Sequence, residues 1–330
     1  MNKNFHGIDI AARFEIAEKN GYGVSLAVSD GSAVETFGVG SGRFGQDFPV
    51  NPEMLFQAGS VSKPAFAMTL LRFADRGEID LDADISAVVS DFAEAPLTLS
   101  ALLSHTAGFN VHGFDGYPAA HAQLSLEDVL AGRGNSPRVQ RVLPAGQQFV
   151  YSGGGITLAE LAFTRITGMT LQDAFAQEIA APLGLCRTGF FQPLDEDMVQ
   201  NAAFGGRLGK TEDAAHGYHQ YPEHAAAGLW TTPAELTKIG IALGRSYREG
   251  GLLKRETAVR MAAPVLENYG LCLFRQGGAA WHEGCNEGFL TLWMFSLTDD
   301  FCVAGMVNRD DEAAYRNLWE VLNPVFARQI

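Results

Sequence analysis

Residues 289–307 read FLTLWMFSLTDDFCVAGMV, in which two apolar runs flank the pair Asp299-Asp300. The runs are rich in aromatic and branched side chains that favour strands, and the acidic pair suits a tight turn. They therefore predict an antiparallel hairpin. Strand patterns also occur at 269–274 and 279–282, so we expect the end of the chain to form a meander of neighbouring strands.

Working outward, the two ends of the chain carry matching signals. Residues 10–17 follow helical spacing and stop before Asn20-Gly21, which predicts an N-terminal amphipathic helix. Residues 24–39 alternate around an Asp-Gly turn and predict a hairpin. Residues 311–328 place their apolar side chains on one helical face. From about 60 to 209 helix patterns dominate, with few convincing strands.

This order predicts a fold of the α/β class, in its α+β form. An antiparallel sheet is assembled from both ends of the chain and flanked by N- and C-terminal helices, and an all-helical domain is inserted between them. We predict one catalytic unit over 1–330, with 1–80 plus 210–330 as an α/β subdomain and 81–209 as a mainly helical subdomain. No repeat or low-complexity linker separates these parts.

Composition narrows the function further. The 330 residues are 47% hydrophobic, which is enough to bury a core of ordinary size. A formal net charge of −14 argues against nucleic acid or an anionic membrane as the main partner. The chain starts with frequent charges and no apolar stretch of signal-peptide length, so we expect a cytoplasmic protein. The four cysteines show no C-x-x-C pair, and we expect neither metal nor cofactor.

The first candidate site is Ser60-Val61-Ser62-Lys63. A spacing of three residues places Ser60 and Lys63 on one helical face, with Cβ atoms roughly 5–6 Å apart. Serine becomes a nucleophile when a base takes its proton, and a lysine can be that base when burial lowers its pKa. The flanks are apolar, which indicates that Lys63 is buried. The pattern alone also fits a capping serine beside a solvated lysine.

The second candidate is Tyr151, which lies between a turn-like Pro144-Ala145-Gly146 and a helix beginning near Ile156. A tyrosine at such a junction can direct its hydroxyl into a cleft. Beside an ammonium group we expect its pKa to fall, which would let it shuttle a proton. The other interpretation is a core tyrosine with one hydrogen bond.

The third candidate is Trp281-His282-Glu283-Gly284-Cys285-Asn286, at the end of a predicted strand. The glycine lets the strand backbone approach a ligand closely, and the next N–H, that of Cys285, can donate to an oxyanion. The alternative is an edge-strand histidine with a glycine bulge.

In this order the three segments resemble the motifs of serine β-lactamases, penicillin-binding proteins and their esterase relatives. Residues 98–108, TLSALLSHTAG, are similar to a further segment of that superfamily, as are 182–185 and 227–233. The resemblance implies an acyl-enzyme on Ser60, proton exchange through Lys63 and Tyr151, and an oxyanion hole from the backbone N–H groups of Ser60 and Cys285. We also predict a catalytic His282 and these substrate contacts: Gly153, Trp281, Gly284, Asn286, His112 and Tyr117.

The chain departs from class C β-lactamases at two positions. Gly153 stands where they carry asparagine, and His282-Glu283-Gly284 stands where they carry Lys-Thr-Gly. Both changes weaken recognition of a β-lactam carboxylate, because histidine is mostly neutral at pH 7. The His-x-Gly form is similar to that of family VIII carboxylesterases and D-stereospecific aminopeptidases.

The sequence therefore favours an esterase that acts on small acyl esters and turns over β-lactams slowly or not at all. A D-amino-acid amidase or aminopeptidase is the main alternative, with Glu283 or Glu287 receiving the substrate ammonium. A weak β-lactamase and a non-catalytic binding or assembly protein on the same scaffold also stay open. The expected partner is a small ester or amide. The oligomeric state does not follow from the sequence.

Overall fold

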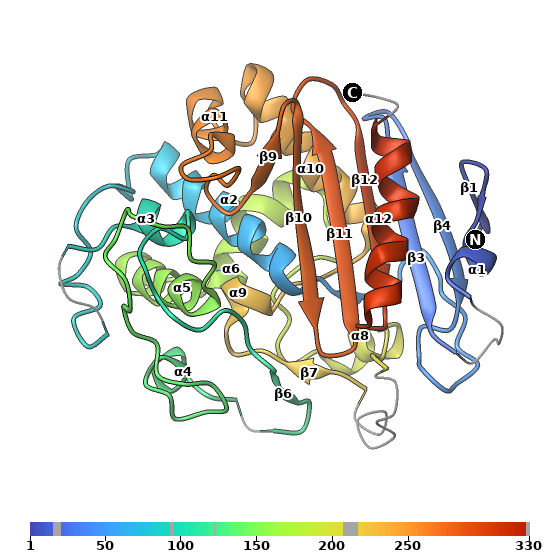
Figure 1. The fold of residues 1–330 in the computed structure, drawn as a ribbon, viewed down its shortest axis with the longest axis horizontal. Helices are drawn as coiled ribbons and strands as arrows, with labels where there is room; N and C mark the ends of the chain where they lie inside the picture. Colours follow the sequence, from blue (N-terminus) through green and yellow to red (C-terminus); the bar gives the residue numbers. More distant parts are fainter. Residues whose placement is uncertain (16–20, 93–95, 122, 207–216, 328–330) are drawn as a thin grey trace.

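A six-stranded antiparallel sheet forms the frame of the protein, with the strand order β4-β3-β12-β11-β10-β9 (Figure 1). The computed structural model describes residues 1–15, 21–92, 96–121, 123–206 and 217–327. The sheet strands are β3 Gly23–Ser29, β4 Val34–Gly40, β9 Phe274–Gln276, β10 Ala279–Asn286, β11 Phe289–Ser296 and β12 Cys302–Val307. Because β12 pairs with β3, the two ends of the chain join in the centre of the sheet, as the sequence predicted.

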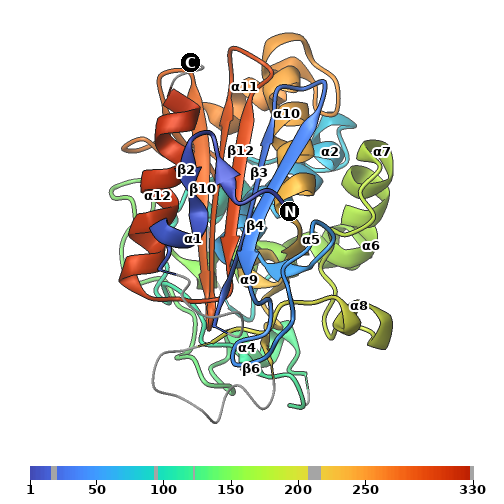
Figure 2. The same cartoon turned by 90° about the vertical axis from the view of Figure 1, so that its right-hand side faces the viewer.

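Helices cover both faces of this sheet (Figure 2). On the outer face lie α12, Glu312–Ala327, and α1, Ile10–Arg13, and their apolar residues share one cluster with the strands. On the inner face lies α10, Pro233–Glu249, which begins with Pro233 after the capping residue Thr232. The inner face and the helices beyond it form a second, larger core.

Most of the remaining helices lie beside the sheet, at the left of Figure 1. The remaining helices are α2 Ser62–Asp75, α3 Leu99–Leu103, α4 Leu126–Leu130, α5 Gly153–Thr167, α6 Leu171–Phe175, α7 Ala181–Leu183, α8 Glu196–Gln200, α9 His224–Ala227 and α11 Arg255–Ala262, with a 3₁₀ turn at Gly59–Val61 and a π turn at Ala176–Ala180. Short strand pairs join Phe56–Gln57 (β5) to Trp230–Thr231 (β8) and Tyr117–Pro118 (β6) to His219–Gln220 (β7). Asn4–Phe5 (β1) and Ile8–Asp9 (β2) form a third pair.

Two local predictions were wrong. The N-terminal helix has only four residues, because Glu15 adopts a left-handed backbone with φ of 54°, and Ala17 lies outside the described residues. The strand expected at 269–274 begins only at Phe274, since Cys272 has φ of 57° and interrupts the extended chain. The division into subdomains 1–80 plus 210–330 and 81–209 stays a prediction.

Candidate active site

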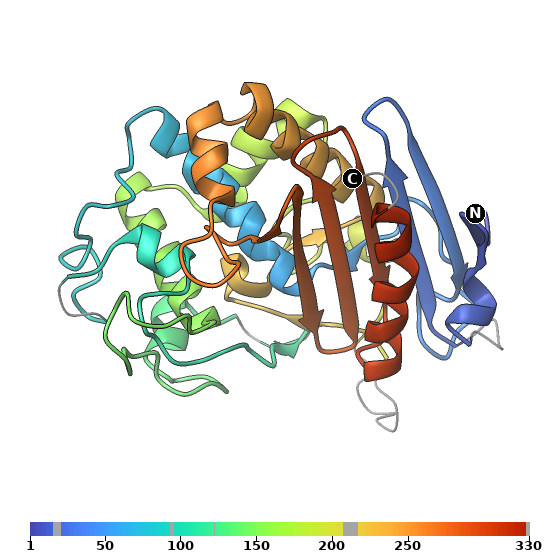
Figure 3. The ribbon, with the colours of Figure 1, turned by 45° about the horizontal axis from the view of Figure 1, so that its top comes forward.

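Ser60 lies on the 3₁₀ turn that leads into α2, and Lys63 lies in the first turn of that helix. Figure 3 shows α2 as a blue helix on the inner side of the sheet. The Lys63 Nζ atom is 2.9 Å from Ser60 Oγ and donates to the Ala226 carbonyl of α9 at 2.8 Å. Lys63 is 2% exposed, and this burial lowers its pKa to about 7. At neutral pH a large fraction of this amine is therefore uncharged and has a lone pair beside the serine hydroxyl.

Two glycines let strand β10 approach the Ser60 turn closely. A Cβ atom at Gly284 would lie 2.9 Å from the Ser60 nitrogen and even closer to the Ala58 carbonyl oxygen. A Cβ atom at Gly59, whose φ is 52°, would lie 2.7 Å from the Cys285 nitrogen. Only residues without a side chain fit there. As a result, the backbone nitrogens of Ser60 and Cys285 meet at the same narrow gap.

Ser62, the second hydroxyl of the motif, fixes this turn from the buried side. Its Oγ donates to the Gly59 carbonyl at 2.6 Å and accepts from the Leu229 N–H at 2.9 Å. Ser62 is fully buried, whereas Ser60 lies at the cavity. The two serines of the motif therefore have different environments, and only Ser60 is open to a ligand.

Tyr151 reaches the same place from the loop before α5. Ser152 caps that helix, with its Oγ accepting from the Gly155 N–H at 2.8 Å, and its own N–H donates to His105 Nδ1 at 3.1 Å. The His105 ring packs 4.3 Å from the Tyr151 ring, and Lys63 Nζ lies 5.0 Å from the centre of the Tyr151 ring. His105 belongs to the TLSALLSHTAG segment, which was noted in the sequence without a structural role.

The expected fall in the Tyr151 pKa was wrong. Removal from water raises the pKa of Tyr151 well above its usual value, and its hydrogen bond with Ser60 only partly opposes this shift. A charged lysine would have lowered the pKa, but Lys63 is itself buried and loses much of its charge near pH 7. Tyr151 is thus a neutral phenol hydrogen-bonded to the candidate nucleophile.

His282 of β10 is held by hydrogen bonds at both ring nitrogens. Nδ1 lies 2.7 Å from the Glu283 carbonyl oxygen, and Nε2 lies 3.2 Å from the Tyr269 hydroxyl. Because a carbonyl oxygen can only accept, Nδ1 carries the proton and Nε2 accepts from Tyr269. Burial and the nearby Lys63 lower the pKa of His282 to about 3. The imidazole is therefore neutral at pH 7, as expected from the sequence.

These groups surround a cavity of about 290 Å³. It is lined by Ser60, His112, Phe149, Tyr151, Phe274, His282, Glu283, Gly284, Cys285, Leu290 and Tyr315. Among the candidates from the sequence, Ser60, Tyr151, His282, Gly284, Cys285 and His112 lie at this cavity, with Lys63 behind Ser60. The structure thus brings the three motif segments together; the individual catalytic roles stay predictions.

The other predicted contacts lie elsewhere. Gly153 faces the His112 carbonyl and the Phe114 ring. Trp281 points to the outer side of the sheet and stacks on Phe274, with ring centres 5.6 Å apart. Asn286 is buried and donates to Gln57 Oε1 and to the Ala227 carbonyl. The Tyr117 hydroxyl accepts from the Asn135 N–H. None of these four residues is among those that line the cavity.

Several cavity residues gave no signal in the sequence. Phe149, Phe274, Leu290 and Tyr315 are apolar or aromatic residues outside the motifs, and Tyr269 was assigned only to a strand. The Ala226 carbonyl that binds Lys63 is a backbone group 163 residues away, so no side chain could reveal it. The 227–233 segment, which carries part of the resemblance, was the nearest signal in the sequence for this contact with Lys63.

A second polar cluster lies where α9 packs against α5. Glu160 Oε2 accepts from the Ala225 N–H at 2.8 Å, and its Oε1 is 3.8 Å from His224 Nδ1. Neither carboxylate oxygen of Glu223 has a hydrogen-bond partner within the described part of the chain. Burial raises the pKa of Glu160 to about 8 and that of Glu223 to about 7, and it lowers the pKa of His224 to about 4.

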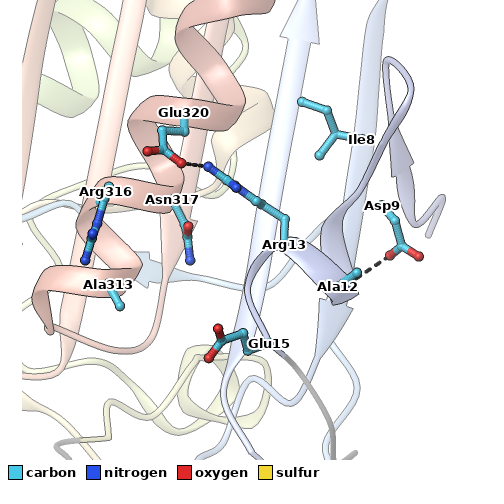
Figure 4. A pocket seen from close by; sticks show the side chains of 9 residues that line it. All are labelled: Ile8, Asp9, Ala12, Arg13, Glu15, Ala313, Arg316, Asn317 and Glu320. Carbon is cyan, nitrogen blue, oxygen red and sulfur yellow. Dashed lines mark hydrogen bonds and ion pairs between the residues drawn. The ribbon is translucent and has the colours of Figure 1, made fainter.

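A larger cavity of about 630 Å³ lies far from this chemistry, between α1 and α12 (Figure 4). It is crossed by the ion pair of Arg13 with Glu320, and the described residues that line it include no serine, cysteine or histidine. In the described residues, no group of three or more His, Cys, Asp and Glu side chains could hold a metal ion. Among the helices described here, none is long and apolar enough to cross a membrane.

The chain is similar to known proteins over almost its whole length. The structure of a D-amino acid amidase from Ochrobactrum anthropi SV3 matches with a TM-score of 0.80 at 18% identity, covering 97% of each chain, which supports the same fold. A putative penicillin-binding protein PbpX of Bacillus subtilis (strain 168) is 21% identical over 92% of this chain and 74% of its own length. Esterase EstB of Burkholderia gladioli is 28% identical over 43% of this chain, and that match spans only 40% of EstB. The Beta-lactamase family model matches residues 12–323, so the chain belongs to the beta-lactamase family.

Proposed function

We propose that the protein is a serine esterase that cleaves small esters through an acyl-enzyme on Ser60. The observation that carries this proposal is the 2.9 Å contact between Ser60 Oγ and the buried amine of Lys63, whose pKa is about 7. A base with a pKa near the working pH is the most effective at removing a proton in the transition state. The alternative interpretation, a capping serine beside a solvated lysine, is disfavoured because Lys63 is buried and donates to the Ala226 carbonyl.

The first half of the reaction uses the groups around Ser60. The Ser60 hydroxyl gives its proton to the lone pair of Lys63 as Oγ attacks the ester carbonyl. The backbone N–H groups of Ser60 and Cys285 donate hydrogen bonds to the carbonyl oxygen and stabilise its negative charge. Because these donors are fixed in place before the reaction, they need not reorganise as the charge develops. When the carbon–oxygen bond to the alcohol breaks, the Tyr151 phenol donates its proton to the leaving alkoxide and regains one from the Lys63 ammonium.

The second half reverses these roles. A water molecule gives a proton to the uncharged Lys63, directly or through Tyr151, and its oxygen attacks the acyl carbon. The bond from that carbon to Ser60 Oγ then breaks, the serine regains its proton, and the carboxylic acid leaves. Both halves use the same oxyanion site, which is why one pocket can serve acylation and deacylation.

The charge of the cavity favours esters over β-lactams. No Lys or Arg lines the cavity in the described residues, and His282 is neutral with a pKa of about 3. A β-lactam carboxylate would therefore have no cation to bind in the cavity wall, and charge-assisted hydrogen bonds are about twice as strong as neutral ones. The family's D-amino acid amidase structures keep amide cleavage as the second candidate, which Glu283 in the cavity wall also favours.

One substrate panel tests the proposal. The same preparation is assayed with p-nitrophenyl esters, nitrocefin and D-amino-acid p-nitroanilides, and the nucleophile is identified by fluorophosphonate labelling and mass spectrometry. We expect turnover of the short p-nitrophenyl esters to exceed that of nitrocefin by at least tenfold, with the label on Ser60. A label on Ser152 or Ser62, or faster nitrocefin turnover, would contradict the proposal.

A further inference from the structure

Glu283 is the one acidic side chain in the described wall of the active-site cavity. It lies on β10 between His282 and Gly284, two of the motif residues. Its Oε2 atom accepts hydrogen bonds from the Tyr315 hydroxyl at 2.6 Å and from Trp319 Nε1 at 3.3 Å, both on α12. Those two donors hold the carboxylate in place.

The other groups in the wall leave the charge of Glu283 without an opposite charge. Burial lowers the pKa of His112, with a further contribution from Lys63, and His282 is neutral as described above. Burial and the neighbouring carboxylate raise the pKa of Tyr315 to about 12, so this phenol keeps its proton and donates. The rest of the cavity wall includes Leu290 and Phe274. Apart from Glu283, the side chains in the described cavity wall are thus neutral.

This combination suits an organic cation. A carboxylate supplies the opposite charge, and aromatic faces attract an ammonium group through their quadrupole. Glu283 precedes Cys285 by two residues on the same strand, so their Cα atoms are about 6.6 Å apart. A cation at Glu283 would therefore belong to the same small substrate whose carbonyl oxygen lies at the Cys285 N–H.

We propose that Glu283, held by Tyr315 and Trp319, forms a subsite for a cationic group of the substrate, so that the enzyme prefers esters or amides bearing an ammonium group close to the scissile bond. The proposal rests on the proposed function, since it places the cation relative to an acyl group on Ser60.

Matched substrate pairs test the subsite. The 2-(trimethylammonio)ethyl ester of a short acid is compared with its neutral isostere, the 3,3-dimethylbutyl ester, which places the charge in the alcohol part. D-alanine p-nitroanilide and its N-acetyl derivative place it in the acyl part. In at least one pair we expect kcat/KM of the wild type to favour the cationic member by about tenfold, as for a charge-assisted contact at a partly exposed site.

The variant E283Q should remove that preference while it keeps the size of the side chain and its acceptor oxygen. Glu256→Gln is the matched control, because Glu256 is an exposed residue of α11 and its loss changes the net charge by the same amount. In E256Q the cation preference should stay as in the wild type. A preference that survives in E283Q, or one that E256Q also abolishes, would show that the overall negative charge of the protein and not the subsite is responsible.

Two further measurements keep the test decisive if E283Q is poorly folded. In the wild type, the ratio of kcat/KM for cationic and neutral substrates should fall as salt is raised, because exposed charges are screened. Y315F keeps the charge of Glu283 but removes the donor at 2.6 Å, so we expect a loss of a few-fold in the same ratio. An unchanged ratio in both measurements overturns the inference.

Failure of this inference can be told apart from failure of the proposed function. If Ser60 is labelled and the neutral esters are hydrolysed without any preference for cations, only the subsite is wrong. If no ester or amide is hydrolysed and Ser60 stays unlabelled, the proposed function fails as well.

Discussion

Where the short helix α9 packs against α2, the Ala226 carbonyl accepts from Lys63, and where it packs against α5, the Ala225 N–H donates to Glu160. Both side chains are buried, and burial moves both toward their uncharged forms: the pKa of Lys63 falls to about 7 and that of Glu160 rises to about 8. Their surroundings differ in one respect. Lys63 touches Ser60, which opens on a cavity, whereas Glu160 does not line that cavity.

The difference teaches that a shifted pKa alone does not identify a catalytic group. Desolvation affects any buried ionisable side chain, so the pKa values of Glu160 and Glu223 are shifted as clearly as that of Lys63. A catalytic role also needs a nucleophile within hydrogen-bond distance and room for a substrate. Variants on the two sides of α9 should therefore change different quantities, turnover on the Lys63 side and pH-dependent stability on the Glu160 side.

Ser60→Ala should have the largest effect. Removing the nucleophile is expected to reduce kcat roughly 10⁴-fold or more and to abolish fluorophosphonate labelling, because no acyl-enzyme can form. The protein should still fold, since Ser60 lies at the cavity and Ser62 makes the hydrogen bonds that fix the turn. Substantial remaining turnover in a folded S60A protein would contradict the assignment of Ser60 as the nucleophile.

Lys63→Met should reduce kcat by 10²–10⁴-fold, the usual range for loss of a general base. Methionine has a similar length and is easily buried, so the variant separates chemistry from packing. A loss below about tenfold would contradict the role of Lys63 as base.

The pH profile of the wild type gives a second test of Lys63 as the general base. Only the uncharged amine can take a proton, so kcat/KM should rise with pH and level off above about 7. E160Q should leave the midpoint of this rise within a few tenths of a pH unit. A midpoint that moves strongly in E160Q would mean that the two sides of α9 act as one titrating unit.

Tyr151→Phe should lower kcat at least 10²-fold, because it removes only the hydroxyl that is hydrogen-bonded to Ser60. The ring contacts with His105 and Lys63 are kept, so the melting temperature should change little. The opposite result, with activity kept and the melting temperature lowered, would favour the interpretation as a core tyrosine.

Glu160→Gln should have the smallest effect on turnover and act on stability instead. A carboxyl whose pKa is raised from 4.5 to about 8 stabilises the fold below pH 4.5, and that stabilisation is lost as the pH rises toward 8. Glutamine can still accept from the Ala225 N–H but does not titrate. The unfolding free energy of E160Q relative to the wild type should thus increase between pH 5 and 8, by at most about 1.4 kcal/mol per pH unit. Urea titrations at several pH values measure this difference. A difference that is constant with pH would argue against a protonated Glu160.

The sequence predicted those parts of the protein that depend on neighbours along the chain. The Ser60 to Lys63 spacing determines that both side chains share a helical face, and the apolar flanks of this motif indicated its burial. Periodicity located the hairpin of β3 and β4, the pair β11 and β12, and the helix α12. Gly284 was recognised as a position of close backbone approach, although the sequence did not reveal that Ala58 and Ser60 lie opposite it.

Only the tertiary structure decided which distant groups meet at these positions. The Ala226 carbonyl reaches Lys63, Tyr269 holds His282, and α12 brings Tyr315 to Glu283. The direction of the Tyr151 pKa was mistaken for the same reason, because it depends on how much water the surrounding segments exclude. Helical spacing and turn preferences are properties of a few consecutive residues, whereas desolvation and hydrogen-bond partners are set by segments far apart in the chain, and these are known only once the chain is packed.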